Sequence, residues 1–529
     1  MSRTRWTRRR FLGRAAAASA AVSFPVVLRG AVSKTGSRKP NVLFIMSDDM
    51  RVELGCYSSM FQAKTPNLDA LAKSGVRFDR NYCQFPLCNP SRSSLLTGYN
   101  PTKTGVLGNR TAFRDIHPDW TSLPQLFRQN GYISVRAGKI FHGGIDDPKA
   151  WDTATGGDAA EEGGMESHAL GHVMDTSKMA ERTERDLRSP KFAPPSADET
   201  EGRRRALYSD RIVVLDGYGE GHGDYHTADR TIENLQRYKD QPFFIACGFV
   251  KPHSPPTAPQ RFFDWYDPGK IKLTPDFAAW PTVPPGFPSA AIRPHNADLF
   301  IGRGASEAEA RQVICAYLAS ISWVDWNVGR VLAELDRLGL RDNTVIVFLA
   351  DHGYQLGEKG KWSKAGSLFE MGTRVPLVIS APGLKGNGRS CYRIVQSLDI
   401  YPTLVEFCGL PRQGSNEGES LTPLLKNPAA HWDKPALSIW SEDGKTIHGT
   451  AVRTEKWRYA EYSGGWGNGA NSASGGNGAN GGNGEGGAML LDPHADPLEL
   501  KNLANDEKYK SVVAELSPLA RKYAATLET

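Results

Sequence analysis

The fold class of this chain is decided by the stretch Asn41-Val42-Leu43-Phe44-Ile45-Met46-Ser47-Asp48-Asp49. Residues 42–46 are apolar without interruption, which is typical of a short strand that is buried on both faces of a parallel sheet. The run ends at Ser47, so two carboxylates follow directly after the predicted strand.

Strands and helices alternate in the sequence beyond this stretch. Thr65 can cap a helix and Pro66 suits its first position, so a helix is expected to begin there and to end at Gly75. A second, long helix is expected from Ser306, where Glu309 completes a capping box. Further strands are expected at 76–78, 243–246, 345–349 and 377–379. This alternation predicts a wound α/β sheet.

The composition changes near residue 434, which suggests a domain at 39–433 followed by a smaller C-terminal α+β subdomain at 434–529. Residues 451–453 and 456–459 predict strands of an antiparallel unit. Residues 463–487 are almost entirely Gly, Asn, Ser and Ala. Such a segment cannot bury enough apolar surface to become ordered, so we expect a disordered insert.

The N-terminal segment is strongly basic. The first thirty residues hold seven arginines and no acidic residue, and without these arginines the formal net charge of +6 would be −1. The charge therefore gives no indication of nucleic-acid binding. The sequence Thr7-Arg8-Arg9-Arg10-Phe11-Leu12, followed by an Ala-rich run, resembles a twin-arginine export signal over residues 1–32. It predicts a periplasmic protein with no stable membrane insertion once the signal is removed; an ordinary secretory signal is the alternative.

The strongest functional motif is Cys88-Asn89-Pro90-Ser91-Arg92-Ser93-Ser94-Leu95-Leu96-Thr97-Gly98. Pro90 favours the first turn of a helix, so Cys88 is expected just before its N-terminus, where free N–H groups and the helix dipole favour an anion. Arg92 lies one turn further along on roughly the same face. A thiolate would also be activated at this place, and the alternative is a buried structural cysteine ahead of a helix.

This motif resembles the signature of the type I sulfatases, in which the cysteine is converted to formylglycine by a formylglycine-generating enzyme. The resemblance extends over most of residues 40–520 and is closest to the iduronate-2-sulfatase-like branch. It implies an alkaline-phosphatase-like fold, in which a large mixed sheet is flanked by helices and joined by a smaller C-terminal subdomain. The matching stretches are 41–49, 65–75, 88–98, 137–142, 250–253, 350–353, 356–358 and 362–364.

Acidic residues follow two of the predicted strands. Asp48 and Asp49 follow the first, and Asp351 and His352 follow the strand at 345–349. Ligands of wound α/β sheets collect at this carboxyl edge, and three carboxylates suit a hard divalent cation. The resemblance implies one calcium ion held by the three aspartates together with Cys88 and His352. His352 is the less natural ligand, because calcium prefers oxygen.

Four basic residues also lie near predicted strand ends or loops: Lys139, His142, His253 and Lys364. Taken singly, each is more often a structural hydrogen-bond partner. The resemblance implies that all four are catalytic, together with Cys88 and Arg92.

The mechanism that the resemblance implies begins with a formylglycine hydrate at position 88, one hydroxyl of which attacks the sulfur of the ester. The charge on the sulfate is held by Arg92, Lys139 and Lys364. His253 or Lys364 protonates the leaving alcohol, and His142 then takes the proton of the second hydroxyl as sulfate leaves.

The expected substrate is a sulfated sugar or polysaccharide, such as a glycosaminoglycan. Two alternatives remain open at this point: a phosphate or phosphonate ester hydrolase of the same superfamily, and an inactive glycan-binding relative.

Overall fold

The computed structural model describes residues 39–57, 59–155, 171–173, 211–412, 414, 416–463 and 486–524. The predicted signal segment 1–32 lies outside the described residues, as does the insert 463–487 apart from its first residue and its last two. Within the described ranges, no helix combines the length and apolar character needed to cross a bilayer.

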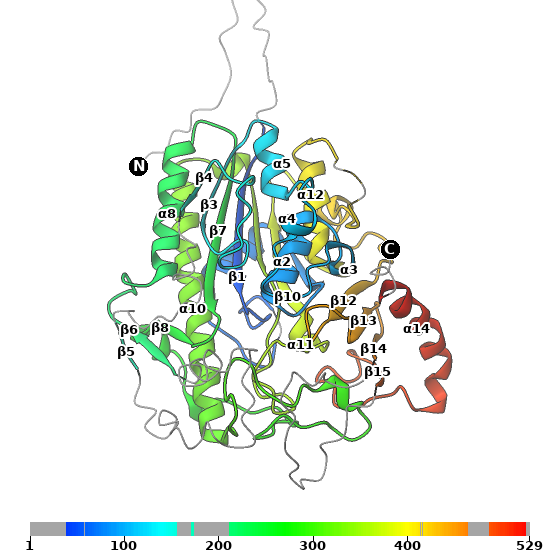
Figure 1. Cartoon of the computed structure of the whole chain (residues 1–529). Helices are drawn as coiled ribbons and strands as arrows, with labels where there is room; N and C mark the ends of the chain where they lie inside the picture. The colour runs from blue at the N-terminus through cyan, green and yellow to red at the C-terminus, as the bar shows by residue number, and fades with distance from the viewer. Residues whose placement is uncertain are drawn as a thin grey trace, which may run out of the picture. The chain divides into compact units, whose positions relative to one another are not determined.

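A mixed sheet of eight strands forms the centre of the protein (Figure 1). Its order is β11-β2-β10-β9-β1-β7-β3-β4. β1 is parallel to β7 and β9, and β3 is parallel to β7, whereas β10 is antiparallel to both of its neighbours. The strands are β1 Asn41–Asp48, β2 Val76–Tyr82, β3 Ile133–Gly138, β4 Thr153–Thr155, β7 Phe243–Pro252, β9 Thr344–Ala350, β10 Arg374–Ser380 and β11 Ser390–Gln396.

Helices cover both faces of this sheet. Alternate residues of β1 point to opposite faces, so Leu43 and Ile45 pack in one apolar cluster while Phe44 and Met46 pack in another. Residues of α1, α8 and α10 belong to the first cluster, and residues of α2, α5, α12 and α13 belong to the second. Figure 1 shows α8 and α10 on one side of the sheet and α2, α5 and α12 on the other. These helices are α1 Pro66–Ser74, α2 Cys88–Thr97, α5 Leu123–Gln129, α8 Gly223–Tyr238, α10 Glu307–Arg337, α12 Ile400–Phe407 and α13 Thr422–Lys426.

The C-terminal part contains a four-stranded antiparallel sheet in sequential order, against which α14 packs. A third sheet of three short strands has the order β5-β6-β8. The α/β fold class with a smaller C-terminal α+β unit, predicted from the sequence, is therefore confirmed. The remaining elements are β12 Ala436–Trp440, β13 Gly449–Arg453, β14 Arg458–Tyr462, β15 Gly487–Leu491, α14 Lys510–Ala524, β5 Gly171–Val173, β6 Val213–Leu215, β8 Thr257–Pro259, α3 Pro101–Thr104, α4 Phe113–Ile116, α9 Gln260–Phe263 and α11 Glu370–Thr373.

Several local expectations were wrong. Thr65 precedes α1 but its side chain does not cap it, because its hydroxyl accepts the N–H of Gly55 and donates to Asp69. Cys88 is the first residue of α2 rather than the residue before it. The strand expected at 456–459 begins two residues later, because 454–457 form the turn between β13 and β14.

A buried ion cluster joins the C-terminal sheet to the rest of the protein. The Glu370 carboxylate, at the start of α11, accepts hydrogen bonds from Arg458 at 2.6 Å and from the Tyr82 hydroxyl at 2.8 Å, and it pairs with Arg453 at 3.3 Å. Arg453 ends β13, Arg458 begins β14 and Tyr82 ends β2. These side chains are almost fully buried, so the carboxylate compensates two guanidinium groups that water cannot reach.

We expect Glu370→Gln to lower the free energy of unfolding by about 3 kcal/mol or more, because it removes the buried carboxylate that pairs with Arg453 and leaves Arg458 paired with Glu499 alone, 2.9 Å from its Nε. Urea denaturation followed by circular dichroism measures this. Glu455→Gln is the control: Glu455 pairs with Arg80 but is 43% exposed, so its loss should cost less than about 1 kcal/mol. Equal effects of the two substitutions would contradict the structural role of the cluster.

A candidate active site at the carboxyl edge of the sheet

Four neighbouring parallel strands end at the same edge of the central sheet, and each is followed by candidate site residues. The register pairs Ser47 of β1 with Ala350 of β9 and with Phe249 of β7, so the ends of these strands lie side by side. This arrangement brings together residues that are up to about 300 positions apart in the chain. They are Asp48 and Asp49 at the end of β1, Lys139 after β3, His253 after β7, and Asp351 and His352 after β9.

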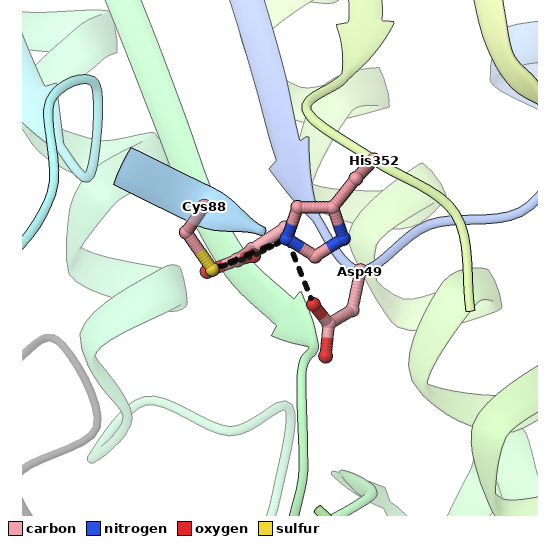
Figure 2. A group of neighbouring side chains, drawn as sticks. Asp49, Cys88 and His352 are labelled. Atoms are coloured by element: carbon pink, nitrogen blue, oxygen red, sulfur yellow. Dashed lines mark hydrogen bonds and ion pairs between the residues drawn. The ribbon is translucent and has the colours of Figure 1, made fainter. Parts of the chain in front are cut away.

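Both carboxylates of the Asp48-Asp49 pair reach the same centre. The Asp48 Oδ1 atom lies 3.3 Å from Cys88 Sγ, and Asp49 Oδ1 lies 3.4 Å from His352 Nε2, which is itself 3.2 Å from Cys88 Sγ. Figure 2 shows Cys88, His352 and Asp49 turned toward one another. Successive side chains of a strand point to opposite faces. The backbone breaks this alternation, because the register with β7 shifts after Ser47 and φ of Asp49 is 61°.

Helix α2 delivers the cysteine and the arginine of the motif, and all of its residues are buried. The Arg92 Nε atom bonds to Asp351 Oδ2 at 2.9 Å, and Nη1 donates to the carbonyls of Lys139 and Ile140. Its Nη2 atom is buried without a hydrogen-bond partner, 3.7 Å from Asp48 Oδ2. The Ser91 hydroxyl donates to the Asp351 carbonyl at 2.5 Å, so the helix is fastened to the end of β9 at two points.

Two buried lysines neutralise the aspartates. The Lys139 Nζ atom lies 2.5 Å from Asp48 Oδ2, and Lys364 Nζ lies 2.9 Å from Asp49 Oδ2 and 3.2 Å from Asp298 Oδ1. Burial alone would lower both lysine pKa values, but Asp48 raises that of Lys139, and Asp298 and Asp49 raise that of Lys364. Both lysines are therefore charged at neutral pH.

The negative charges of Asp48 and Asp49 are balanced unequally by the neighbouring cations. Burial favours the neutral form of Asp48, but Lys139 and Arg92 outweigh it and lower its pKa. Burial raises the pKa of Asp49 to about 7 against the opposing effect of Lys364. Asp49 Oδ1 is also buried without a hydrogen-bond partner. The surrounding residues therefore balance the ionised form of Asp49 only in part, and a bound cation would stabilise that form.

The donor set fits a divalent cation. One ligand atom from each of Asp48, Asp49, Cys88 and His352 lies within 4.8 Å of the others, and all four residues are buried. Asp351 is not in this group; its oxygens accept the N–H of Asp49 and of His352 and pair with a guanidinium. Burial lowers the pKa of His352, but Asp351 and Cys88 raise it to about 10.

Two histidines lie beside this cluster and are only partly buried. Burial and the charge of Lys139 lower the pKa of His142 to about 3, and burial and Lys364 lower that of His253 well below its ordinary value. Both rings are therefore neutral at pH 7 and can accept a proton. His142 Nδ1 has no hydrogen-bond partner, whereas His253 Nδ1 lies 2.8 Å from the Ser254 carbonyl.

All of the residues selected from the sequence thus lie in or beside one cluster, but the sequence did not indicate every member. Asp298, which holds Lys364, stands in an irregular segment that matches no motif. Tyr317 bonds to the backbone of Asp49 and lies in the long helix that was expected from Ser306, but no motif marks it as a site residue. Ser91 was within the motif, yet its hydrogen bond to Asp351 could not be anticipated.

Comparison with known proteins gives consistent results. A family model described as "Sulfatase" matches residues 40–410, and a second, described as "N-sulphoglucosamine sulphohydrolase, C-terminal", matches residues 357–466. A sulfatase from Formosa agariphila is 32% identical over 501 residues, which cover 92% of this chain and 87% of that protein. Iduronate 2-sulfatase from Homo sapiens is 30% identical over 413 residues, 70% of this chain and 69% of that protein.

The fold is shared with a solved structure from Bacteroides fragilis described as a "putative sulfatase" (20% identical, covering 93% of this chain and 96% of that one, TM-score 0.65) and with a phosphonate monoester hydrolase from Silicibacter pomeroyi. The latter is 22% identical, covers 92% of this chain and 95% of its own, and has a TM-score of 0.67. The predicted alkaline-phosphatase-like architecture is therefore confirmed.

Proposed function

This chain belongs to the sulfatase family of sulfuric ester hydrolases, and on that premise we propose that it hydrolyses a sulfate ester of a sugar or polysaccharide through a formylglycine at position 88 and one calcium ion. The observation that carries the proposal is the position of Cys88. It begins a buried helix and touches Asp48 and His352. Arg92 and Lys139 lie against Asp48, and Lys364 pairs with the adjacent Asp49.

Conversion of Cys88 to formylglycine would supply an aldehyde whose hydrate has two hydroxyls, one to attack sulfur and one to expel sulfate afterwards. A serine at this place would lack the second hydroxyl. In the unmodified protein, Cys88 Sγ marks the approximate position that the hydroxyl oxygens of the hydrate would occupy. Its place at a helix N-terminus, where backbone N–H groups favour an anion, supports a role in holding the sulfate group.

Calcium would be held by Asp48, Asp49 and Asp351, with residue 88 and His352 as further ligands. When bound, it would balance the carboxylates and draw charge from the sulfate oxygens. The partly uncompensated Asp49 supports such an ion, as does the group of four converging ligand atoms. Asp351 belongs to the ligand set only if binding shifts the hydrogen bonds that it now accepts.

The basic residues divide into two kinds. Arg92, Lys139 and Lys364 are charged and buried, so they can stabilise the negative charge of the transferring sulfate. We assign His142, whose Nδ1 has no hydrogen-bond partner, as the base that takes the proton of the second hydroxyl. Its pKa of about 3 would rise when a bound anion offsets the charge of Lys139. The proton for the leaving alcohol comes from Lys364 or from His253, whose pKa would rise as the anionic ester balances the nearby lysine.

One related protein and one family model support a sulfated sugar as substrate. The name of the human relative specifies iduronate 2-sulfate, and the C-terminal family model is described by an N-sulphoglucosamine activity. We propose a sulfated sugar residue as the substrate class. A panel of defined sulfated mono- and oligosaccharides, with free sulfate measured, tests this, and hydrolysis of simple aryl sulfates only would contradict it.

We expect protein produced with a formylglycine-generating enzyme to yield a peptide about 18 Da lighter at residue 88 than the thiol form, and to hydrolyse an aryl sulfate. Mass spectrometry and a colorimetric assay measure the two results. Cys88→Ala should fold and be inactive. His142→Gln should release up to one equivalent of alcohol and then turn over at least about 100-fold more slowly, because the base of the second step is missing.

An active Cys88→Ala protein would exclude this mechanism. The phosphonate monoester hydrolase of the same fold supplies the alternative function, so aryl phosphate and phosphonate esters are assayed in parallel. Faster hydrolysis of these than of the sulfate would favour the alternative, and no hydrolysis of any ester by the modified protein would favour an inactive glycan-binding relative.

Removal of the metal gives a separate prediction. We expect chelation to abolish aryl sulfate hydrolysis and calcium to restore it better than zinc, because carboxylate oxygens dominate the proposed site. Activity is measured after dialysis against chelator and titration with each ion. Elemental analysis that finds bound zinc and no calcium would contradict the assignment.

We also propose that residues 1–32 direct export to the periplasm by the twin-arginine route, which transports folded proteins. Replacing both Arg8 and Arg9 by Lys should leave the precursor in the cytoplasm, as fractionation and immunoblotting would show. Normal processing of the double variant would favour an ordinary secretory route.

A further inference from the structure

The direction in which the Asp49 side chain points depends on an unfavourable backbone conformation at this residue. Its φ of 61° lies in the left-handed region, which Asp tolerates better than most residues but which still costs free energy. In an extended conformation Asp49 would point away from Asp48, on the opposite face of the strand. An interaction from elsewhere in the protein must therefore hold the backbone at this residue.

The hydroxyl of Tyr317 makes this interaction. It donates to the Asp49 carbonyl at 2.6 Å and lies 3.0 Å from the Arg51 backbone nitrogen, whose N–H donates to it. One oxygen thus bonds to the peptide groups on both sides of Met50, directly after the left-handed residue. Tyr317 is 2% exposed, so water cannot replace it.

The element that carries Tyr317 is rigid. Tyr317 lies within α10, a helix of 31 residues whose N-terminus has a complete capping box at Ser306 and Glu309. Residues 313–325 of this helix are buried without exception. The hydroxyl is therefore fixed in space by packing that does not depend on the Asp48-Asp49 segment.

Other attachments hold the same segment. The N–H of Asp49 donates to Asp351 Oδ1 at 3.2 Å, and a further attachment lies farther from the site. The Arg51 guanidinium pairs with Glu358 at 2.7 Å and with Glu53 at 2.8 Å. These bonds hold the peptide group before Asp49 and the side chain of Arg51, but none of them engages the Asp49 carbonyl or the Arg51 N–H, which are the two groups that Tyr317 holds. The loss of the Tyr317 hydroxyl should therefore change the backbone conformation of Asp49 without releasing the segment.

We propose that Tyr317 is a positioning residue of the metal site: its hydroxyl holds the left-handed backbone at Asp49 and thereby keeps that carboxylate on the same side as Asp48. The inference rests on the proposed calcium ion and adds a residue that does not touch it. By linkage, an interaction that favours the binding-competent conformation of Asp49 must also be strengthened when the metal binds.

The test compares calcium binding to the metal-free full chain by isothermal titration for the wild type, Tyr317→Phe and Tyr57→Phe. Tyr57 is the matched control, since its hydroxyl is equally buried and also bonds to backbone groups, of Phe78 and Leu377, away from the site. We expect Tyr317→Phe to raise the calcium Kd at least tenfold and Tyr57→Phe to change it less than twofold. Saturating calcium should restore most of the kcat of Tyr317→Phe.

Equal calcium affinity of the wild type and Tyr317→Phe overturns the inference and leaves the proposed function intact. A wild-type protein that binds no calcium overturns both. Amide hydrogen exchange of the wild type tests the inference even where Tyr317→Phe fails to fold. Calcium should slow exchange at the Arg51 amide, which donates to Tyr317, and exchange unaffected by calcium would overturn the proposal.

Discussion

The structure depends on mutual compensation among charged groups that are buried together at one edge of a sheet. Placing Asp48, Asp49 and Asp351 out of contact with water costs several kcal/mol for each unpaired charge, so cations must be supplied from within the fold. Arg92, Lys139 and Lys364 supply them, and each comes from a different part of the chain. The architecture can be understood as the arrangement that brings these segments to one place: parallel strands that end together, a buried helix and a long loop.

The loop that carries Lys364 is attached at both of its ends by buried ion pairs. Glu358 pairs with Arg51, close behind the candidate metal site, and Glu370 pairs with Arg453 and Arg458 of the C-terminal sheet. The C-terminal sheet therefore contributes to the position of a candidate catalytic lysine without supplying one itself. A change in the packing of that sheet would reach the site through this loop.

Much of this arrangement could be predicted from the sequence because parallel strands end at a common edge. Once 42–46 and 345–349 were identified as strands, the aspartates that follow each strand were expected at the same edge of the sheet. The Cys88 motif indicated that this edge holds the active site. Strand ends were less predictable: β7 extends to Pro252 because it pairs with β1 and β3, although Gly248 and Lys251 interrupt its apolar pattern. Asp298 and Tyr317 could not be found at all, since their roles arise from contacts more than 60 residues away along the chain.

If Cys88 is converted to formylglycine as proposed, its burial sets the order of modification and folding during synthesis. In the folded chain this residue is 2% exposed and is covered by His352, 264 positions later. A modifying enzyme that acts on residue 88 must therefore reach it before that later segment has folded into place. At about 5–20 residues per second, translation leaves an interval of roughly 13 to 50 s between the two positions. The yield of modified protein is then a kinetic competition between enzyme encounter and closure of the sheet, and a faster-folding variant would be a less completely modified one.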